Sequence, residues 1–561
     1  MTSPLSSNIP YLVCALLAAG TTGGTSYAFG IYGQALKETL NLTQSQLDTI
    51  SSANFAAGVV SWIPGGIVDR RGPKVGLIAG GILGSFSLML FWAISRSIIP
   101  IVPPSLIVTL LSACGILIFV ASSLITGSVF KLLVKYTSQQ HKGSAVGAAK
   151  GYVGLGSGAY AVMFESLNRS NDLDFLPMAA FFFLAAASLP AICLLPSENK
   201  KQEDGQNNAT HTSRMDSKPD ISTSAHYSAL YLGLLSMAFL VIGQSIVQLL
   251  QVGSAEHNNS HGPNYIITFM IPLVWFGPIL AWFLLPTQSI ALFDTTLRSK
   301  GSDTNDNEDQ DVKNDFRTDN DNDMDQNHEI EFLLDEAEST NDNIPESLDY
   351  DLFQMLQTSP AWLLLWTCTV LAGGGTLMTN NLGQMVQSLG FHPKVVPAAL
   401  SLFSVFQSFG RVLMGIYSSQ PNTRRTVFLI VASVAGLVSH TVLAVSTTLL
   451  PFLSGVVLSG LAFGMVWPLL VLISGEIFGT KYMGANYMFY DGFMSAIGTL
   501  TISKFVAQRV YEDHVEKGST VCYGPECFRL THWIVVVLTF SCLVSSWCLH
   551  ASKLSKRAYA N

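Results

Sequence analysis

Residues 65–74 of this chain read Gly-Gly-Ile-Val-Asp-Arg-Arg-Gly-Pro-Lys. They form a short charged link between two apolar runs, near 49–68 and 75–95. Each run has roughly the 20 residues that a helix needs to cross a bilayer core of about 30 Å. Backbone in lipid must satisfy its own hydrogen bonds, so such runs cross as helices. The link therefore indicates a chain that crosses a membrane, turns within a few polar residues and crosses back.

Similar runs recur along the whole chain. Of its 561 residues, 49% are hydrophobic and only 12% are charged, whereas about a quarter are charged in soluble domains. The runs lie near 11–33, 49–68, 75–95, 105–130, 144–164, 176–195, 227–250, 265–286, 359–380, 395–417, 426–446, 450–474, 485–507 and 531–550. We therefore expect an all-α, polytopic membrane protein with about fourteen spanning helices, rather than a soluble helical bundle. The first run lacks a basic leader and is too long for a signal peptide.

Basic residues are distributed unevenly between the two sides of these runs. Twenty Lys and Arg residues fall in loops on the side of the amino terminus, and seven fall on the other side. By the positive-inside rule, both termini are expected in the cytoplasm. Asn41, Asn168 and Asn258 begin sequons on the outer side, so they are candidate glycosylation sites. We expect a multi-pass protein of the plasma membrane or of a vacuolar or endosomal membrane.

One long hydrophilic stretch, residues 287–358, interrupts the runs. Residues 294–351 hold twenty acidic and four basic side chains, a net charge of −16, whereas the whole chain carries −8. The membrane part is therefore basic, at +8. Low hydrophobicity and high net charge predict a disordered cytoplasmic loop. We do not expect a calcium site in it, because Met324 stands where a calcium-binding loop needs glycine.

The same loop contains a candidate sorting signal. Glu329 lies four residues before the pair Leu333 and Leu334, the pattern of an acidic dileucine motif. On a flexible cytoplasmic loop it could bind a sorting adaptor and direct the protein to an endosomal, lysosomal or vacuolar membrane. The alternative is an accidental match to a short pattern.

Two of the eight cysteines, Cys522 and Cys527, lie together in the outer loop before the last run. The outer side is oxidising at the cell surface and in secretory compartments. Gly524 and Pro525 between them favour a tight turn. We expect a disulfide here, with two free thiols as the alternative.

The chain also contains a weak repeat at an offset of about 350 residues. In the first unit of the repeat, glycines at 20–24 precede a helix that ends in a basic loop. In the second unit, glycines at 373–375 precede another helix that ends in a basic loop. Gly65 aligns with Gly415, and Lys74 aligns with Arg424. Repeated helix bundles that face each other are how many secondary transporters build a central site with alternating access.

The first unit resembles the signature of the major facilitator superfamily, Gly-x-x-x-Asp-Arg-x-Gly-x-basic. The matching residues are Gly65, Asp69, Arg70, Gly72 and Lys74. The resemblance implies a gating latch between the halves of the protein at the cytoplasmic face. Asp69 would face the positive amino-terminal end of a helix from the other half, and Arg70 would hold a carboxylate. The alternative is a loop that only enforces topology.

The second unit departs from this signature, because Ser419 replaces the acid. We therefore expect a one-sided latch.

Other stretches narrow the resemblance to the nodulin-like branch of that superfamily. They are residues 142–156, 381–384, 409–412 and 522–528. The resemblance implies two six-helix bundles with an extra helix pair between them. The implied parts are a bundle at 1–196, a cytoplasmic linker at 197–226, the pair at 227–286, the acidic loop at 287–358 and a second bundle at 359–561.

Few ionisable side chains lie within the runs, and each is a functional candidate because it is costly in lipid. Lys150, Arg411 and Asp491 lie at similar depth in the cytoplasmic half. In one interpretation Lys150 or Arg411 binds an anionic solute and Asp491 exchanges a proton. In the other they form inter-helix salt bridges that lock one conformation, and for Arg411 we favour a structural role.

Uncharged residues supply further candidates. Asn380, Asn381 and Gln384 lie at the outer end of their run, where they could bind a polar solute or line a wet vestibule. The spacings Gly147/Gly151 and Gly154/Gly158 favour close helix packing.

Enzyme signatures are missing from the sequence. It has no phosphate-binding glycine loop, no His/Cys metal spacing and no nucleophile elbow, and nothing in it indicates a cofactor or nucleic acid. We therefore expect a secondary active transporter that moves a small polar or anionic solute across the lipid bilayer, with protons as the candidate coupling ion. The alternative is a transporter-like nutrient sensor or membrane scaffold that signals through the acidic loop.

Overall fold

The computed structural model describes residues 4–26, 29–42, 44–98, 104–167, 171–196, 221–251, 265–284, 349–392, 395–420, 424–515 and 522–558. These ranges are helical almost throughout and contain no strand. A helix lies at each of the fourteen predicted runs. Within the described ranges, nine helices are long and apolar enough to cross a membrane, and three shorter helices are also apolar. The all-α polytopic fold is confirmed, and the count of fourteen spans stays a prediction.

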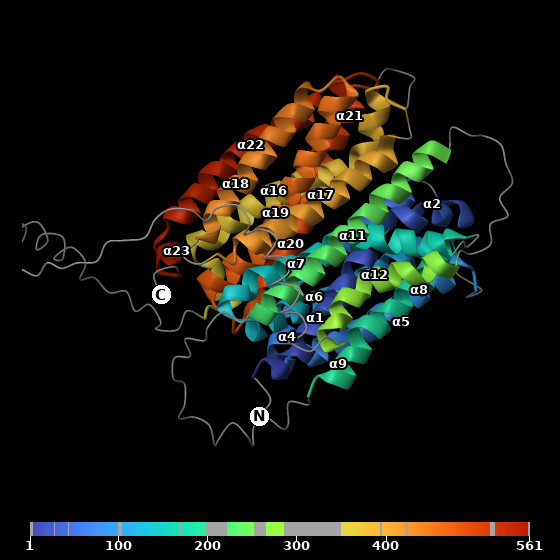
Figure 1. Ribbon diagram of the computed structural model, residues 1–561. Helices are drawn as coiled ribbons and strands as arrows, with labels where there is room; N and C mark the ends of the chain where they lie inside the picture. The colour runs from blue at the N-terminus through green and yellow to red at the C-terminus, as the bar shows by residue number, and fades with distance from the viewer. Residues whose placement is uncertain are drawn as a thin grey trace, which may run out of the picture.

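The first third of the chain forms one helix bundle, called here the first bundle (Figure 1). Its elements are α1 (Pro4–Ser26), α2 (Phe29–Thr39), α3 (Gln44–Ala56), η1 (Ala57–Val60), α4 (Trp62–Arg71), α5 (Pro73–Ser95), α6 (Pro104–Tyr136), η2 (Gln139–His141), α7 (Lys142–Ser166), η3 (Asp172–Asp174), α8 (Phe175–Phe182), the π-helix η4 (Phe183–Ser188) and α9 (Leu189–Leu194). Helix α6 packs on α5 and α1, and α1 also packs on α7.

The last third forms the second bundle. Its elements are α15 (Leu352–Leu356), α16 (Ser359–Ser388), α17 (Val395–Tyr417), α18 (Arg425–Val445), α19 (Leu449–Phe478), α20 (Met483–Gly498), the π-helix η6 (Thr499–Val506), α21 (Ala507–Asp513), α22 (Glu526–Ala551) and α23 (Lys553–Ala558). Helix α18 packs between α19 and α22, and α16 packs on α20 and α22.

Between the bundles in sequence come α11 (Ile221–Gln251) and α12 (Tyr265–Leu284), which lie along the first bundle (Figure 1). Helix α12 contacts α1 and α7, whereas α11 contacts α7 and also α17 of the second bundle. The pair therefore reaches the junction of the two bundles through α11.

Large apolar side chains cover the outside of the molecule. Phe86, Phe181, Phe239 and Phe540 are each at least 60% exposed, and so is Trp547. In water such a surface would be a strong liability, but in a bilayer it faces lipid tails of equal apolarity. The outer surface is thus that of a membrane-embedded protein.

The two ends of the helices define two faces. The terminal face holds the start of α1 and the end of α22, together with residues 69–74, 415–420 and 478–485; the far face holds the ends of α2, α5 and α16. In Figure 1 the amino terminus, α4, α9 and α23 lie at one end of the bundles, and α2 and α21 lie at the other.

The bundles meet along two seams on the terminal side, α4 against α20 and α7 against α17. Each seam is closed by glycine. A Cβ on Gly65 would lie 2.2 Å from the carbonyl oxygen of Gly484, and a Cβ on Gly147 would lie 2.5 Å from the Cα of Gly415. The aligned glycines Gly65 and Gly415 therefore serve the same purpose, since each allows helices of opposite bundles into backbone contact.

Candidate functional site

A cavity of about 680 Å³ lies between the two bundles, toward the far face. Its wall combines aromatic side chains such as Tyr32 and Phe463 with neutral polar ones. The polar lining residues are Ser51, Asn54, Ser157, Gln244, Thr376, Thr379, Asn380, Ser401, Ser404 and Gln407. No described residue that lines it carries a charge. A cavity of this size and mixed lining suits a small organic solute.

The charged residues lie beneath this cavity, in a smaller pocket of about 60 Å³. The two spaces share Asn54 and Phe55, so they adjoin. The smaller pocket is lined by Lys150, Arg411 and Asp491. The sequence-derived charge set is therefore brought together, at the floor of the cavity.

Lys150 and Asp491 form an ion pair between the bundles, because Lys150 is on α7 and Asp491 is on α20. The ammonium Nζ lies 3.2 Å from Asp491 Oδ1. The hydroxyl of Tyr487, one turn before Asp491, accepts from Lys150 and donates to the same carboxylate. The Lys150 side chain is 3% exposed and that of Asp491 is 16% exposed. The carboxylate is thus the partner that water from the cavity can reach.

Three aromatic rings surround the ammonium of Lys150. Its Nζ lies 4.5 Å from the ring centre of Phe130, 4.8 Å from that of Trp467 and 5.0 Å from that of Tyr487. Ring faces attract a desolvated cation. The site therefore stabilises a buried positive charge with few hydrogen-bond acceptors.

Arg411 contacts α7 through the main chain rather than through a carboxylate. Its Nη1 donates to the Lys150 carbonyl at 2.9 Å, and its Nη2 donates to Gln407 Oε1 at 3.2 Å. Gln407 donates in turn to the Gly154 carbonyl at 3.2 Å, and Ser408 donates to the Gly151 carbonyl at 3.2 Å. Arg411 thus joins α17 to α7 at this seam, and its side chain also lines the small pocket.

Of the three amide candidates on α16, one reaches the cavity. Asn380 lines it and donates to Ser503 Oγ at 3.0 Å. Asn381 donates to the Ser503 carbonyl at 3.1 Å, so it ties α16 to η6. Gln384 is exposed and is not among the lining residues. Asn380 is therefore the member of this group that lines the cavity.

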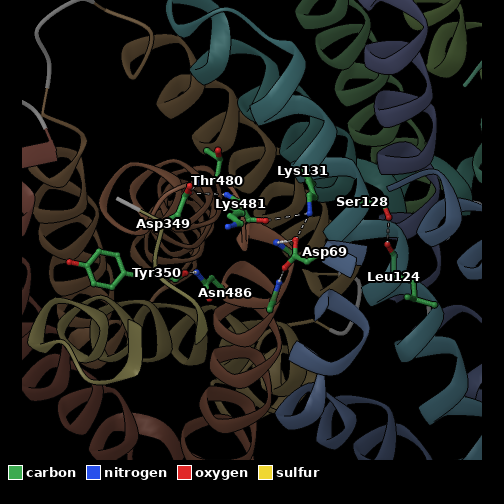
Figure 2. A network of polar contacts seen from close by, with 11 residues as sticks. Asp69, Leu124, Ser128, Lys131, Asp349, Tyr350, Thr480, Lys481 and Asn486 are labelled. Atoms are coloured by element: carbon green, nitrogen blue, oxygen red, sulfur yellow. Dashed lines mark hydrogen bonds and ion pairs between the residues drawn. The ribbon is translucent and has the colours of Figure 1, made fainter. Parts of the chain in front are cut away.

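Asp69 makes the latch on the terminal face (Figure 2). Its carboxylate accepts from the backbone N–H of Gly484 at 3.0 Å and of Ala485 at 2.7 Å, in the first turn of α20. Lys131, on α6, forms an ion pair with the same carboxylate, with its Nζ 2.5 Å from Asp69 Oδ1. An acid at a helix amino terminus satisfies free N–H groups and opposes the positive end of the helix dipole.

The other signature residues support this loop. Gly72 has φ of 85°, a conformation that favours glycine, and it ends α4 just before Pro73 starts α5. Lys74 Nζ donates to the Leu195 carbonyl at 2.5 Å within the first bundle. Arg70 is exposed and makes no ion pair among the described residues; Lys131 makes the ion pair at the latch.

The second unit makes a latch of its own, and the expectation of a one-sided latch is wrong. Ser419 Oγ accepts from the backbone N–H of Ser144 at 2.9 Å, in the first turn of α7, and lies 3.0 Å from the Ser144 hydroxyl. A hydroxyl can satisfy an orphan helix N–H as an acid does, without the charge. Each loop therefore caps a helix of the opposite bundle.

Residues near the end of the acidic loop dock beside the Asp69 latch (Figure 2). Asp349 Oδ1 accepts from the N–H groups of Thr480 and Lys481 at 3.1 and 3.2 Å. The N–H of Tyr350 donates to the Phe478 carbonyl at 2.9 Å, and Asn486 donates to the Tyr350 carbonyl at 2.9 Å. No pattern in the sequence predicts this docking.

On the far face the structure joins Cys522 and Cys527 in a disulfide, with an S–S distance of 2.00 Å. The N–H of Gly524 in this loop donates to the Ser388 carbonyl at 2.8 Å. Asn41 is exposed in the turn after α2. Glu329, Leu333, Leu334, Asn168 and Asn258 lie outside the described residues. No cluster of metal-ligating side chains occurs in the part of the chain that is described.

Comparisons with known proteins agree with this architecture. The family model of the Major Facilitator Superfamily matches residues 14–502. The protein NUCLEAR FUSION DEFECTIVE 4 of Arabidopsis thaliana is 22% identical, over 96% of this chain and 88% of that one. The solved structure of the proton:xylose symporter XylE, bound to 6-bromo-6-deoxy-D-glucose, is similar with a TM-score of 0.54 and 11% identity, covering 97% of this chain and 96% of that one.

Proposed function

Because the chain belongs to the major facilitator superfamily of membrane transporters, we propose that it carries a small polar or anionic solute by alternating access, coupled to protons. The observation that supports this most directly is the floor of the cavity. A buried ion pair, Lys150–Asp491, joins the two bundles directly beneath a solute-sized space. The chain is thus a transporter and not an enzyme, and its solute and coupling ion are the proposal.

The conformation is that of a carrier closed on one side. Both seams and both latches hold the bundles together on the terminal face, while the cavity lies toward the far face. If the terminal face is cytoplasmic, as the loop charges predict, this is an outward-facing state. The sequons then lie outside and the acidic loop inside, where an adaptor could reach Glu329, Leu333 and Leu334.

The ion pair provides a means of coupling. When a proton from the cavity binds Asp491, Lys150 loses its counter-charge and becomes an uncompensated cation in an apolar site. An anionic group that enters the small pocket restores neutrality, so the proton and the solute favour each other's binding. With both bound, the direct charge link between α7 and α20 is weakened and the seams can open. The proposal therefore predicts symport.

The test is uptake into proteoliposomes with D-xylose, lactate, nitrate and glutamine as labelled probes, with and without an inward proton gradient. For a transported probe, Asp491→Asn should abolish gradient-driven accumulation and retain exchange at equal concentrations, because the site can still bind but no longer releases a proton. Lys150→Ala should lose both activities. The matched control is Asp174→Asn, which removes a carboxylate paired with Arg96 inside the first bundle. Accumulation by Asp491→Asn at the wild-type level would refute the coupling role.

The docking of Asp349 and Tyr350 beside the latch favours one second candidate, a nutrient sensor or scaffold that signals through the acidic loop. Deletion of residues 296–345 separates the two functions, because it leaves the docked segment in place. A transporter should keep its uptake rate after this deletion. Loss of signalling together with absence of uptake in the intact chain would favour the sensor.

The division of the chain belongs to the same proposal. We assign the first bundle to residues 1–196, the linker to 197–226, the extra pair to 227–286, the acidic loop to 287–358 and the second bundle to 359–561. Expression of residues 1–196 and 359–561 as separate chains, followed by co-purification, tests whether the two bundles are the units that assemble.

A further inference from the structure

The glycines of α7 face two different helices. Gly147 and Gly154 face α17, where a Cβ on Gly154 would lie 2.7 Å from Arg411 Nη1. Gly151 and Gly158 face α11: a Cβ on Gly151 would lie 2.8 Å from Leu234 Cδ1, and one on Gly158 would lie 3.1 Å from Val241 Cγ1. Residues seven apart lie on the same side of a helix. Helix α11 thus packs closely on α7 along the row formed by Gly151 and Gly158.

Helix α11 also bridges the seam between the bundles. The Tyr231 hydroxyl donates to the Ser144 carbonyl at 3.0 Å, in the turn of α7 that Ser419 caps. Leu234 of α11 and Val412 of α17 both lie against Gly151 of α7. Among the described residues, α12 packs on α1 and α7 of the first bundle, so the pair lies along that bundle and α11 is its edge toward α17.

Toward the far face, α11 reaches the solute cavity. Val241 and Gln244 line it, and Val241 is 5% exposed. On the opposite side of the same helix, Leu232 and Phe239 are 65% and 66% exposed. One side of α11 therefore faces the cavity and the other faces lipid, in the gap between α7 and α17.

From this arrangement we infer that α11 is a wall of the transport cavity and that Gln244 is a solute-binding residue in it. This inference rests on the proposed function and extends it. A primary amide donates and accepts hydrogen bonds, so Gln244 suits a hydroxyl, amide or carboxyl group of the solute. Lys150 and Asp491 would bind the charged or proton-linked end at the floor. Helix α11 of the extra pair is then part of the transport pathway.

The first experiment needs no knowledge of the solute. Gln244→Cys and the matched control Phe239→Cys are made in a chain in which the exposed Cys193 and Cys548 are Ser, and both are treated with a charged, membrane-impermeant maleimide. Only a thiolate in water reacts. Gln244→Cys should react at least about tenfold faster, because lipid around position 239 suppresses the thiolate. Equal, slow reaction at both positions would overturn the inference.

The second experiment concerns specificity. For a probe that the wild type transports, Gln244→Leu should raise KM at least about fivefold with little change in maximal rate, as expected when uniform binding is lost. Phe239→Leu should leave KM unchanged. An unchanged KM in Gln244→Leu would show that position 244 is only wall. The two proposals fail separately. Fast labelling of Gln244→Cys without uptake of any probe would leave the wall intact and refute transport of these probes, whereas uptake without labelling would do the reverse.

Discussion

Neutralising Asp69 should open the terminal face. In Asp69→Asn the side chain keeps one acceptor oxygen, and its new NH₂ group is set against a backbone N–H that needs an acceptor. The two bonds that Asp69 accepts from Gly484 and Ala485 cross between the bundles. Hydrogen bonds to charged groups contribute about 1.5–3 kcal/mol each. The ion pair between Asp69 and Lys131 lies within the first bundle. Its loss in the variant therefore adds nothing to the free energy that holds the two bundles together.

Loss of one cross-bundle bond and weakening of the other costs about 3 kcal/mol. Because about 1.4 kcal/mol is a factor of ten, the ratio of closed to open terminal faces should fall roughly a hundredfold. If the closed form dominates in the wild type, the variant should populate the open form measurably. Side-chain burial supports the full value, since the Asp69 side chain is only 7% exposed.

Distances between spin labels would measure this change. Lys135 on the first bundle and Lys481 on the second are exposed at the terminal face, so each can be replaced by labelled cysteine. Pulsed electron resonance in lipid nanodiscs should show one short distance in the wild type and an added longer one in Asp69→Asn. Asp174→Asn removes an acid paired with Arg96 within one bundle and should change nothing. Identical distributions for wild type and Asp69→Asn, or an equal shift in Asp174→Asn, would refute the reasoning.

Three further outcomes are expected. Gly65→Ala should lower the melting temperature and slow any uptake, because its Cβ would meet a carbonyl oxygen at 2.2 Å, whereas Gly66→Ala, with nothing within 4 Å, should be neutral in both assays. Replacing Cys522 and Cys527 by Ser together should lower the free energy of unfolding by about 2 kcal/mol, since the closed loop is short, and denaturant melts with and without reductant would check this. Asn381→Ala should destabilise the protein by about 1–3 kcal/mol in the same melts, because the Ser503 carbonyl loses the bond that Asn381 donates, and it should leave KM for a transported probe unchanged.

Elements that depend on local sequence could be predicted. Apolar runs located the helices, the charged link located the latch, and Asp69 was expected opposite the amino terminus of a helix from the other half, where it lies. The grouping of Lys150, Arg411 and Asp491 could be inferred from depth, since each lies about two turns from the terminal-face end of its helix. Such features can be predicted because a charged side chain within a membrane is costly, so it is rarely present without a role.

Contacts to the main chain could not be predicted in this way. Gln407, Ser408 and Arg411 donate to carbonyls of α7, and a carbonyl carries no sequence signal. The spacing of the α7 glycines indicated packing, yet it could not show that alternate glycines serve α17 and α11. Lys131 lies 62 residues from Asp69 in the sequence, so no local pattern predicts their ion pair.

The two seams explain the position of the central ion pair. One seam joins α4 to α20, and the carboxylate of Asp69 latches it. The other joins α7 to α17, and the hydroxyl of Ser419 latches it. The uncharged cap of Ser419 is supplemented by the hydrogen bond that Arg411 of α17 donates to α7. Lys150 is on α7 and Asp491 is on α20, so the pair takes one helix from each seam. Neither seam can open widely while α7 and α20 remain joined at the floor. In the proposed mechanism, a solute and a proton that separate Lys150 from Asp491 act on both seams at once, as alternating access requires of a binding site.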